Sequence, residues 1–158
     1  MSGVNVLVVF YSRYGNAEKL ALAAGVGAIQ ARANIRLRRL DDLASPETIQ
    51  ADAAWQENLK RMKKDYIAPR EIDEQWADVL ILSAPPDCLG EMERYLSPPK
   101  EVLKGKLAAV IGTFGETATR AGLNVLPPSA AVQEGAGATN YGRAAAERAK
   151  SVKSSPNP

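Results

Sequence analysis

The chain has 158 residues, with 20 Lys or Arg against 18 Asp or Glu, so its formal net charge is +2 at pH 7. Charges this balanced and this scattered exclude a basic nucleic-acid-binding surface as the basis of function. Histidine is absent and Cys88 is the only cysteine, which excludes an intramolecular disulfide, a His- or Cys-ligated metal site, and Ser-His-Asp or Cys-His catalysis. An enzyme of this composition would take its chemistry from a cofactor or from carboxylate, Lys or Tyr side chains.

The length predicts one domain, and no apolar run approaches the roughly 20 residues that span a bilayer. The N-terminal sequence MSGVNVLVVF enters an apolar strand without the basic segment and cleavage site of a signal peptide. We therefore expect a cytoplasmic protein with no transmembrane segment. A single domain is predicted over residues 1–153, followed by a disordered tail over residues 154–158.

The first predicted elements form a β-α-β unit. Val4–Phe10 is a near-continuous apolar run, which is typical of a strand buried on both faces of a parallel sheet. A helix is predicted over Ala17–Ala31, and Asn34–Leu40 alternates apolar and basic residues, as a less buried strand does. Such a unit is almost always right-handed.

A long helix is predicted next, starting with Ser45 as N-cap and Pro46 at the first helical position. It is expected to continue towards Tyr66 and to bury Ile49, Trp55, Leu59 and Met62. The opposite face carries Lys60, Arg61, Lys63 and Lys64. A solvated helix face explains this basic run, and a contact surface for a partner is the alternative.

The second half of the chain continues the alternation of strands and helices. Strands are predicted over Asp78–Ser83, Lys106–Gly112 and Asn124–Leu126, and helices over Leu89–Leu96, Glu116–Ala121 and Thr139–Val152. The pattern predicts an α/β fold with a doubly wound, five-stranded parallel sheet. Ligands of such sheets bind beyond the carboxyl ends of the strands, so we expect function in the loops over residues 11–17, 84–90 and 113–120.

The first of these loops carries the clearest chemical signal. It places Gly15 and Asn16 at the start of the first helix, directly after the first strand. Free N–H groups and the positive end of the helix dipole suit a phosphate there, and Ser12 can add a hydroxyl donor. An ordinary helix cap explains the spacing equally well. The nucleoside triphosphate motif G-x-x-x-x-G-K-[ST] and the dinucleotide motif G-x-G-x-x-G are both absent.

The segment V-L-V-V-F-Y-S-R-Y-G-N-A-E-K-L-A over Val6–Ala21 resembles the opening of the flavodoxin-like quinone reductases, the group typified by the tryptophan-repressor-binding-protein family. The resemblance continues at Trp76–Asp78, Gly90–Leu96, Leu103–Val110 and Tyr141–Glu147, in order along the chain. It implies a flavodoxin-like fold, an FMN cofactor, and reduction of quinones by NAD(P)H, usually in a homo-oligomer.

The resemblance also implies which residues bind the cofactor, while no catalytic residue can be named. The first loop would surround the FMN phosphate, and the second and third loops would border the flavin ring. The implied cofactor-binding residues are Ser12, Arg13, Tyr14, Gly15, Asn16 and Ala17 in the first loop, Ala84, Pro85 and Pro86 in the second, and Thr113, Phe114 and Gly115 in the third.

The sequence departs from the family pattern in the second loop, which is short, lacks an aromatic residue and contains Pro85 and Pro86, neither of which has an N–H to donate. Two hypotheses follow. In the first, the protein binds FMN and serves in electron transfer or NAD(P)H-dependent quinone reduction. In the second, a flavodoxin-like protein has lost its flavin and acts as an accessory or scaffold subunit of a larger complex, with the basic face at Lys60–Lys64 as a contact surface.

Overall fold

The computed structural model describes residues 3–128, 132 and 134–154, and it contains a five-stranded parallel sheet. The strands lie in the order β2-β1-β3-β4-β5, and every neighbouring pair is parallel. This is the flavodoxin-like doubly wound order, so the predicted fold class is confirmed. The strands are β1 (Asn5–Phe10), β2 (Asn34–Arg39), β3 (Val79–Ser83), β4 (Leu107–Ile111) and β5 (Asn124–Val125).

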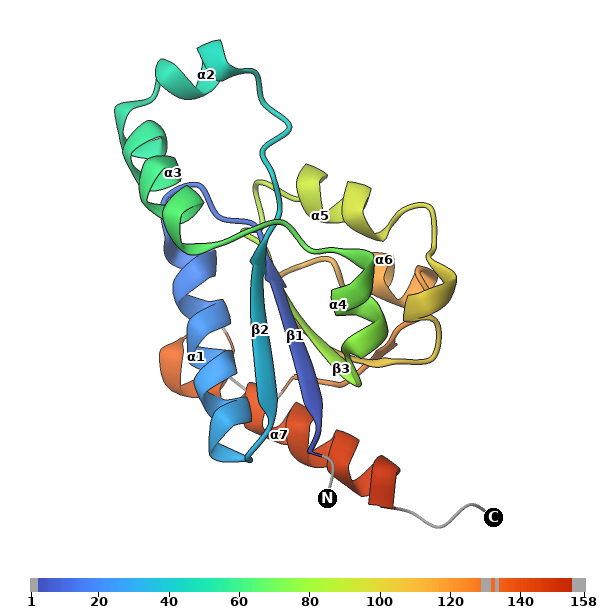
Figure 1. Ribbon diagram of the computed structural model, residues 1–158. Coiled ribbons are helices and arrows are strands. Elements are labelled where there is room, and N and C mark those ends of the chain that lie inside the picture. The colour runs from blue at the N-terminus through green and yellow to red at the C-terminus, as the bar shows by residue number, and fades with distance from the viewer. Residues whose placement is uncertain (1–2, 129–131, 133, 155–158) are drawn as a thin grey trace.

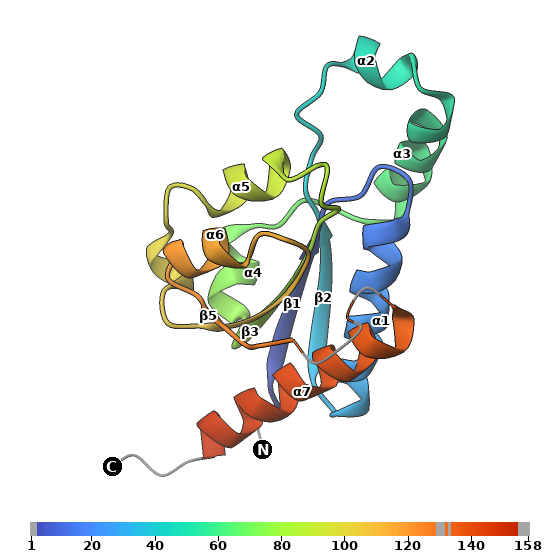
Figure 2. The same ribbon diagram turned by 180° about the vertical axis from the view of Figure 1, so that it is seen from behind.

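Helices cover both faces of the sheet (Figures 1 and 2). Helices α1 and α7 lie on one face, while α4, α5 and α6 lie on the other. None of the helices in the described part of the chain is long and apolar enough to cross a membrane. The helices are α1 (Asn16–Gln30), α2 (Pro46–Gln50), α3 (Ala53–Asp65), α4 (Glu71–Trp76), α5 (Gly90–Leu96), the 3-10 helix η1 (Glu101–Leu103), α6 (Gly115–Arg120) and α7 (Gly135–Ser154).

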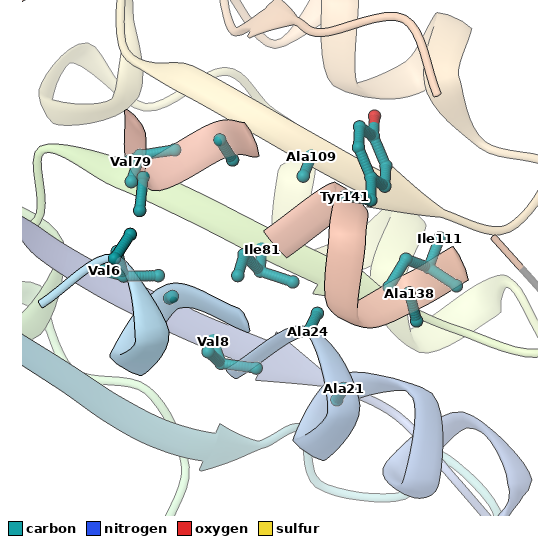
Figure 3. Packing of buried hydrophobic residues seen from close by; sticks show 14 of the residues in the cluster. Val6, Val8, Ala21, Ala24, Val79, Ile81, Ala109, Ile111, Ala138 and Tyr141 are labelled. Atoms are coloured by element: carbon teal, nitrogen blue, oxygen red, sulfur yellow. The ribbon is translucent and has the colours of Figure 1, made fainter. Parts of the chain in front are cut away.

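Alternate residues of the central strands build two separate cores, because successive strand side chains point to opposite faces. Val6, Val8 and Phe10 of β1 pack with α1 and α7, and Figure 3 shows Val8 beside Ala21 and Ala24 of α1. Leu7, Val9 and Tyr11 pack with α4, α5 and α6 on the other face. Burial on both faces explains why β1 is apolar at almost every position.

The segment over residues 45–66 forms two helices, so the prediction of one continuous helix was wrong. The Ser45 hydroxyl accepts a hydrogen bond from the Thr48 N–H at 3.2 Å, so the predicted N-cap is confirmed. The Asp52 carboxylate accepts one from the Trp55 N–H at 3.1 Å and starts α3 as a second cap. Two caps seven residues apart divide the segment, because each satisfies the free N–H groups of its own helix.

Other boundaries also differ from the sequence analysis. Residues 71–76 form α4, in a segment for which the sequence analysis predicts no element, and Asp73 helps to cap this helix by accepting from the Arg70 N–H at 3.0 Å. The last helix begins at Gly135 rather than Thr139 and extends through Ser154. The rest of the predicted tail, residues 155–158, lies outside the described residues.

Helices α2 and α3 form an arm that lies beyond the carboxyl edge of the sheet (Figure 1). After α3 the chain returns alongside β2, where the Arg39 N–H donates to the Ile67 carbonyl at 3.0 Å. The arm therefore ends next to the start of α1, and its side chains can reach the first loop.

Helices α1 and α7 cross unusually closely, at a contact made by two glycines. A Cβ on Gly27 would overlap the backbone carbonyl of Thr139, and one on Gly142 would overlap the carbonyl of Ala24. The absence of side chains at both positions thus sets the spacing of the two helices. Because both helices pack on the same core, their spacing also sets how α1 lies on the sheet.

We predict that Gly27→Ala lowers the free energy of unfolding by about 2 kcal/mol or more, since the added methyl group forces the two backbones apart. The matched control is Gly25→Ala in the same helix, where a Cβ would meet its nearest neighbour, Ile35 Cδ1, at an ordinary 3.5 Å. That variant should be neutral or more stable by up to about 1 kcal/mol, because Ala favours helix over Gly. Urea unfolding of both variants measures the contrast, and equal effects would contradict the close-packing account.

Candidate functional site

The first loop ends in a helix N-terminus with unused hydrogen-bond donors. Gly15 precedes α1 with φ of 103° and ψ of −7°, a left-handed conformation that favours glycine. It provides no side-chain cap, and no described residue accepts a hydrogen bond from the N–H groups of Asn16, Ala17 or Glu18. Three free N–H groups at the positive end of a 15-residue helix form a site suited to an anion.

Ser12 shapes the loop from within. Its side chain is buried, and its Oγ accepts a hydrogen bond from the Gly15 N–H at 3.0 Å. The hydroxyl was expected to donate to a phosphate, and in this geometry it retains its own hydrogen for such a bond. Ser12 therefore closes the turn and keeps one donor.

The carboxyl end of β3 is bound to the same helix start. The Ser83 hydroxyl, fully buried, donates to the Ala17 carbonyl at 2.9 Å. This bond holds the first turn of α1 beside the loop that follows β3. The two loops predicted from the first and third strands are thus brought together at the carboxyl edge of the sheet.

A cleft of about 560 Å³ lies between these two loops. Its volume falls within the range of roughly 300–1,000 Å³ that is common for small-molecule and cofactor sites. Of the twelve residues predicted to bind a cofactor, five line it: Asn16, Ala17, Ala84, Pro85 and Pro86. Four further residues line the cleft and were not predicted, namely Lys19, Leu20, Asp87 and Gly135.

Two of these unpredicted residues carry charge. Lys19 lies three positions after Asn16, so helical periodicity places it above the same opening. That spacing was the signal available in the sequence. Asp87 faces the cleft from the second loop. The cleft therefore has a cation near the helix start and a carboxylate on the opposite loop.

The third loop contributes less than expected. Thr113, Phe114 and Gly115 are not among the residues that line the cleft. Phe114 is only 2% exposed and belongs to the core between the sheet and helices α4 to α6. Its ring also lies against Gly112, where a Cβ would be 2.7 Å from Phe114 Cε1. In this conformation the ring packs in the core and is not available to stack on a ligand.

Arg13 and Tyr14 point towards the arm. The Tyr14 hydroxyl donates to Asp52 at 2.5 Å, and the Arg13 guanidinium lies 4.0 Å from the centre of the Trp55 ring. Arg13 also donates through Nε to the Tyr11 hydroxyl at 2.9 Å. These two side chains tie the loop to the arm, and neither is among the residues that line the cleft.

The negative charge of Glu18, in the first turn of α1, is balanced by an arginine of the arm. Arg61 forms a two-point ion pair with its carboxylate at 2.7 and 2.9 Å, and Tyr66 donates to it at 2.6 Å. The bonds from Arg61 and Tyr66 outweigh burial and lower the pKa of Glu18. Of the basic run, Lys60, Lys63 and Lys64 are exposed as predicted, whereas Arg61 has this specific partner.

No group of three or more His, Cys, Asp or Glu side chains that could hold a metal ion occurs in the part of the chain that the structure describes.

Cys88, which follows the cleft residue Asp87, is partly buried, and this burial raises the pKa of its thiol. A raised pKa keeps the thiol protonated at neutral pH, so Cys88 is not a reactive nucleophile there.

Comparison with known proteins places this geometry in context. No family model matches the chain. It is 30% identical over 82 residues to an NAD(P)H dehydrogenase (quinone) of Deinococcus radiodurans, a match that covers 52% of this chain and 40% of that protein. A protein of the same name from Brucella anthropi is 42% identical over 48 residues, covering 30% and 24%. The matches thus span less than half the length of either relative.

Among solved structures, a flavodoxin from the domain Archaea superposes with a TM-score of 0.64 at 16% identity, covering 93% of this chain and 99% of that one. Strand order and superposition together define the chain as a flavodoxin-like α/β protein. Within that class its sequence resembles the quinone reductases, and the resemblance predicted from Val6–Ala21 is confirmed.

The pairing of Glu18 predicts a pH-dependent stability. Because its pKa is lowered in the folded state, its contribution is present above the unfolded value of about 4.3 and is lost as the pH falls below it. Glu18→Gln should therefore be less stable than the wild type at pH 7, and the difference should shrink between pH 5 and pH 3.

Urea unfolding at several pH values measures this difference. The control Glu116→Gln, at an exposed position in α6, should lie within about 0.5 kcal/mol of the wild type throughout. A Glu18→Gln deficit that stayed constant with pH would contradict the assigned ion pair.

Proposed function

We propose that the protein binds FMN at the cleft between the first two loops and uses it to reduce quinones with NAD(P)H. The observation that carries this proposal is the free N-terminus of α1, which opens beside a cleft of cofactor size at the carboxyl edge of the sheet. The likeness to proteins named NAD(P)H dehydrogenase (quinone) supports the choice of reaction. We further propose that the protein acts in the cytoplasm as a homo-oligomer or within a larger complex.

The residues present fit the phosphate end of FMN. The N–H groups of Asn16, Ala17 and Glu18 and the Ser12 hydroxyl would hold the phosphate oxygens, and Lys19 lines the same cleft. The one carboxylate in the helix's first turn, Glu18, is already bound to Arg61. A dianionic phosphate would thus meet donors and the helix dipole without an unpaired negative charge from that turn.

The flavin ring would meet the second loop. Ala84, Pro85 and Pro86 offer carbonyl oxygens and apolar surface, and the two prolines have no N–H to donate. Phe114 is packed in the core, so the described lining of the cleft presents no aromatic ring to the flavin. Because the ring end provides little directional bonding, we expect the phosphate contacts to supply a large share of the affinity for FMN.

When bound, FMN supplies the redox chemistry, accepting a hydride from NAD(P)H and passing two electrons to a quinone. The chain's own residues bind and orient the cofactor. The first loop fixes the phosphate and thereby the position of the ring, while the second loop covers one side of the cleft. The Asp87 carboxylate on that loop disfavours added negative charge nearby and so opposes a reduced, anionic ring.

We predict that Ser12→Ala combined with Gly15→Val weakens FMN binding at least tenfold, because it removes a donor and strains the turn that presents the helix N–H groups. A Cβ at Gly15 would have no neighbour closer than 3.7 Å, so the effect comes from the backbone conformation. The measurement is a titration of FMN followed by flavin fluorescence.

Gly105→Val is the matched control, since Gly105 also has a positive φ of 82° but lies before β4, at the opposite edge of the sheet. It should lose stability to a similar extent and bind FMN as the wild type does. An unchanged FMN dissociation constant in the Ser12 and Gly15 variant would overturn the assignment of the phosphate loop. A wild-type protein that binds no FMN would overturn the proposed function itself.

A further inference from the structure

A largely buried polar cluster contacts the first loop, and none of its members is among the residues that line the cleft. Its members are Arg39 at the end of β2, Asp42 in the following segment, Tyr11 and Arg13 in the first loop, and Trp55 in α3; this set is called the Arg39 cluster. Asp42 accepts from both Arg39 terminal nitrogens at 3.1 and 3.2 Å, from the Tyr11 hydroxyl at 2.7 Å and from Trp55 Nε1 at 3.2 Å.

Arg39 is nearly completely buried, at 5% exposure, and its Nε has no hydrogen-bond partner among the described residues. Burying a guanidinium and a carboxylate costs free energy that their mutual attraction often fails to recover, and apolar residues of similar volume frequently stabilise a protein more. The ion pair alone therefore does not explain an arginine at this position. Its contacts beyond Asp42 are the features that an apolar residue could not reproduce.

One of those contacts reaches the phosphate loop itself. Arg39 Nη2 donates to the backbone carbonyl of Ser12 at 2.9 Å, a bond between residues 27 positions apart in the sequence. Its Nη1 also donates to the Leu40 carbonyl at 3.1 Å, which fixes the guanidinium plane. In a planar trans peptide the carbonyl and the next N–H point in opposite directions. Holding the Ser12 carbonyl therefore also sets the direction of the Arg13 N–H.

The next residues of the loop are also held, by the arm and by a bond within the loop. Arg13 lies over Trp55, and Tyr14 donates to Asp52, both from the arm. The Ser12 hydroxyl then accepts the Gly15 N–H. Because its oxygen is bonded to Arg39, the Ser12 carbonyl is not free to turn towards an anion, which it would repel.

We propose that Arg39 is a positioning residue for the phosphate of the cofactor: by holding the Ser12 carbonyl, it presets the loop so that N–H groups rather than carbonyl oxygens face the anion. This inference rests on the proposed function, since it concerns the same cleft. It adds that the end of β2 and the arm determine affinity for the phosphate without contacting the ligand. A preset loop avoids the cost of ordering the backbone when the ligand binds.

The experiment compares FMN with riboflavin, which has the same ring but no phosphate. The test variant is Arg39→Gln combined with Asp42→Asn, which removes both charges together and avoids leaving one buried and unpaired. Affinity for FMN should fall at least tenfold, while affinity for riboflavin should stay within about twofold of the wild type. A residue that only stabilised the fold would change both affinities alike, so the ratio of the two separates positioning from stability.

The matched control is Arg38→Gln combined with Asp73→Asn. It breaks a partly buried ion pair of 2.9 Å between the adjacent residue of β2 and Asp73 of α4. Asp73 also pairs with Arg36 and Arg70, and its partners among the described residues lie outside the first loop. This control should lose stability and keep the wild-type ratio of FMN to riboflavin affinity. If the first variant fails to fold by circular dichroism, Arg39→Lys serves instead, because one ammonium cannot replace the guanidinium bonds to both Asp42 and Ser12. It should weaken FMN binding several-fold and leave riboflavin binding unchanged.

Two results would overturn the proposal, and they differ from each other. The first result is that FMN and riboflavin binding weaken equally, or that a folded Arg39 variant keeps the wild-type FMN affinity. Either outcome would show that Arg39 does not position the first loop, and the proposal that the protein binds FMN would still stand. Failure of the wild-type protein to bind either flavin would instead remove the proposed function, and the positioning role with it.

Discussion

The free N–H groups at the start of α1 are the feature on which the rest of the site depends. A helix start leaves its first donors without partners, and most helices satisfy some of them with a side-chain cap. Here Gly15 takes the cap position and offers no side chain, while Ser83 holds the exposed turn against the end of β3. The fold thus leaves these donors free and places a cleft beside them.

The surrounding electrostatics are consistent with this use of the helix start. Arg61 in α3 pairs with Glu18, and the arm also binds the side chains of Arg13 and Tyr14. Burial would raise the pKa of Asp42, but bonds from Arg39 and Tyr11 outweigh it, so the pKa is lowered and the carboxylate stays ionised behind the loop. The other charges near the first loop are paired with one another, so Lys19 and Asp87 are the charged residues that line the cleft.

The sequence was sufficient for the fold because burial on two faces makes strands β1, β3 and β4 apolar almost throughout. For the first loop it was sufficient to place Asn16 and Ala17 beside a cleft, whereas the contacts of Arg13 and Tyr14 with the arm could not be read from it. It was insufficient for residues that depend on tertiary contacts. Asp87 lines the cleft where the second loop lies against the start of α1, and the contact between Arg39 and the Ser12 carbonyl joins residues far apart in sequence. Phe114 was predicted to border the flavin ring, but its side chain packs in the core.

The central claim is that this cleft holds a flavin by its phosphate, and an absorbance spectrum of the purified protein tests it most directly. The spectrum is recorded before and after addition of free FMN and desalting. We predict that the visible and near-ultraviolet bands of flavin persist, at close to one FMN per chain. A protein that stays colourless after this reconstitution would contradict the account, and it would favour a flavodoxin-like protein that acts without a flavin.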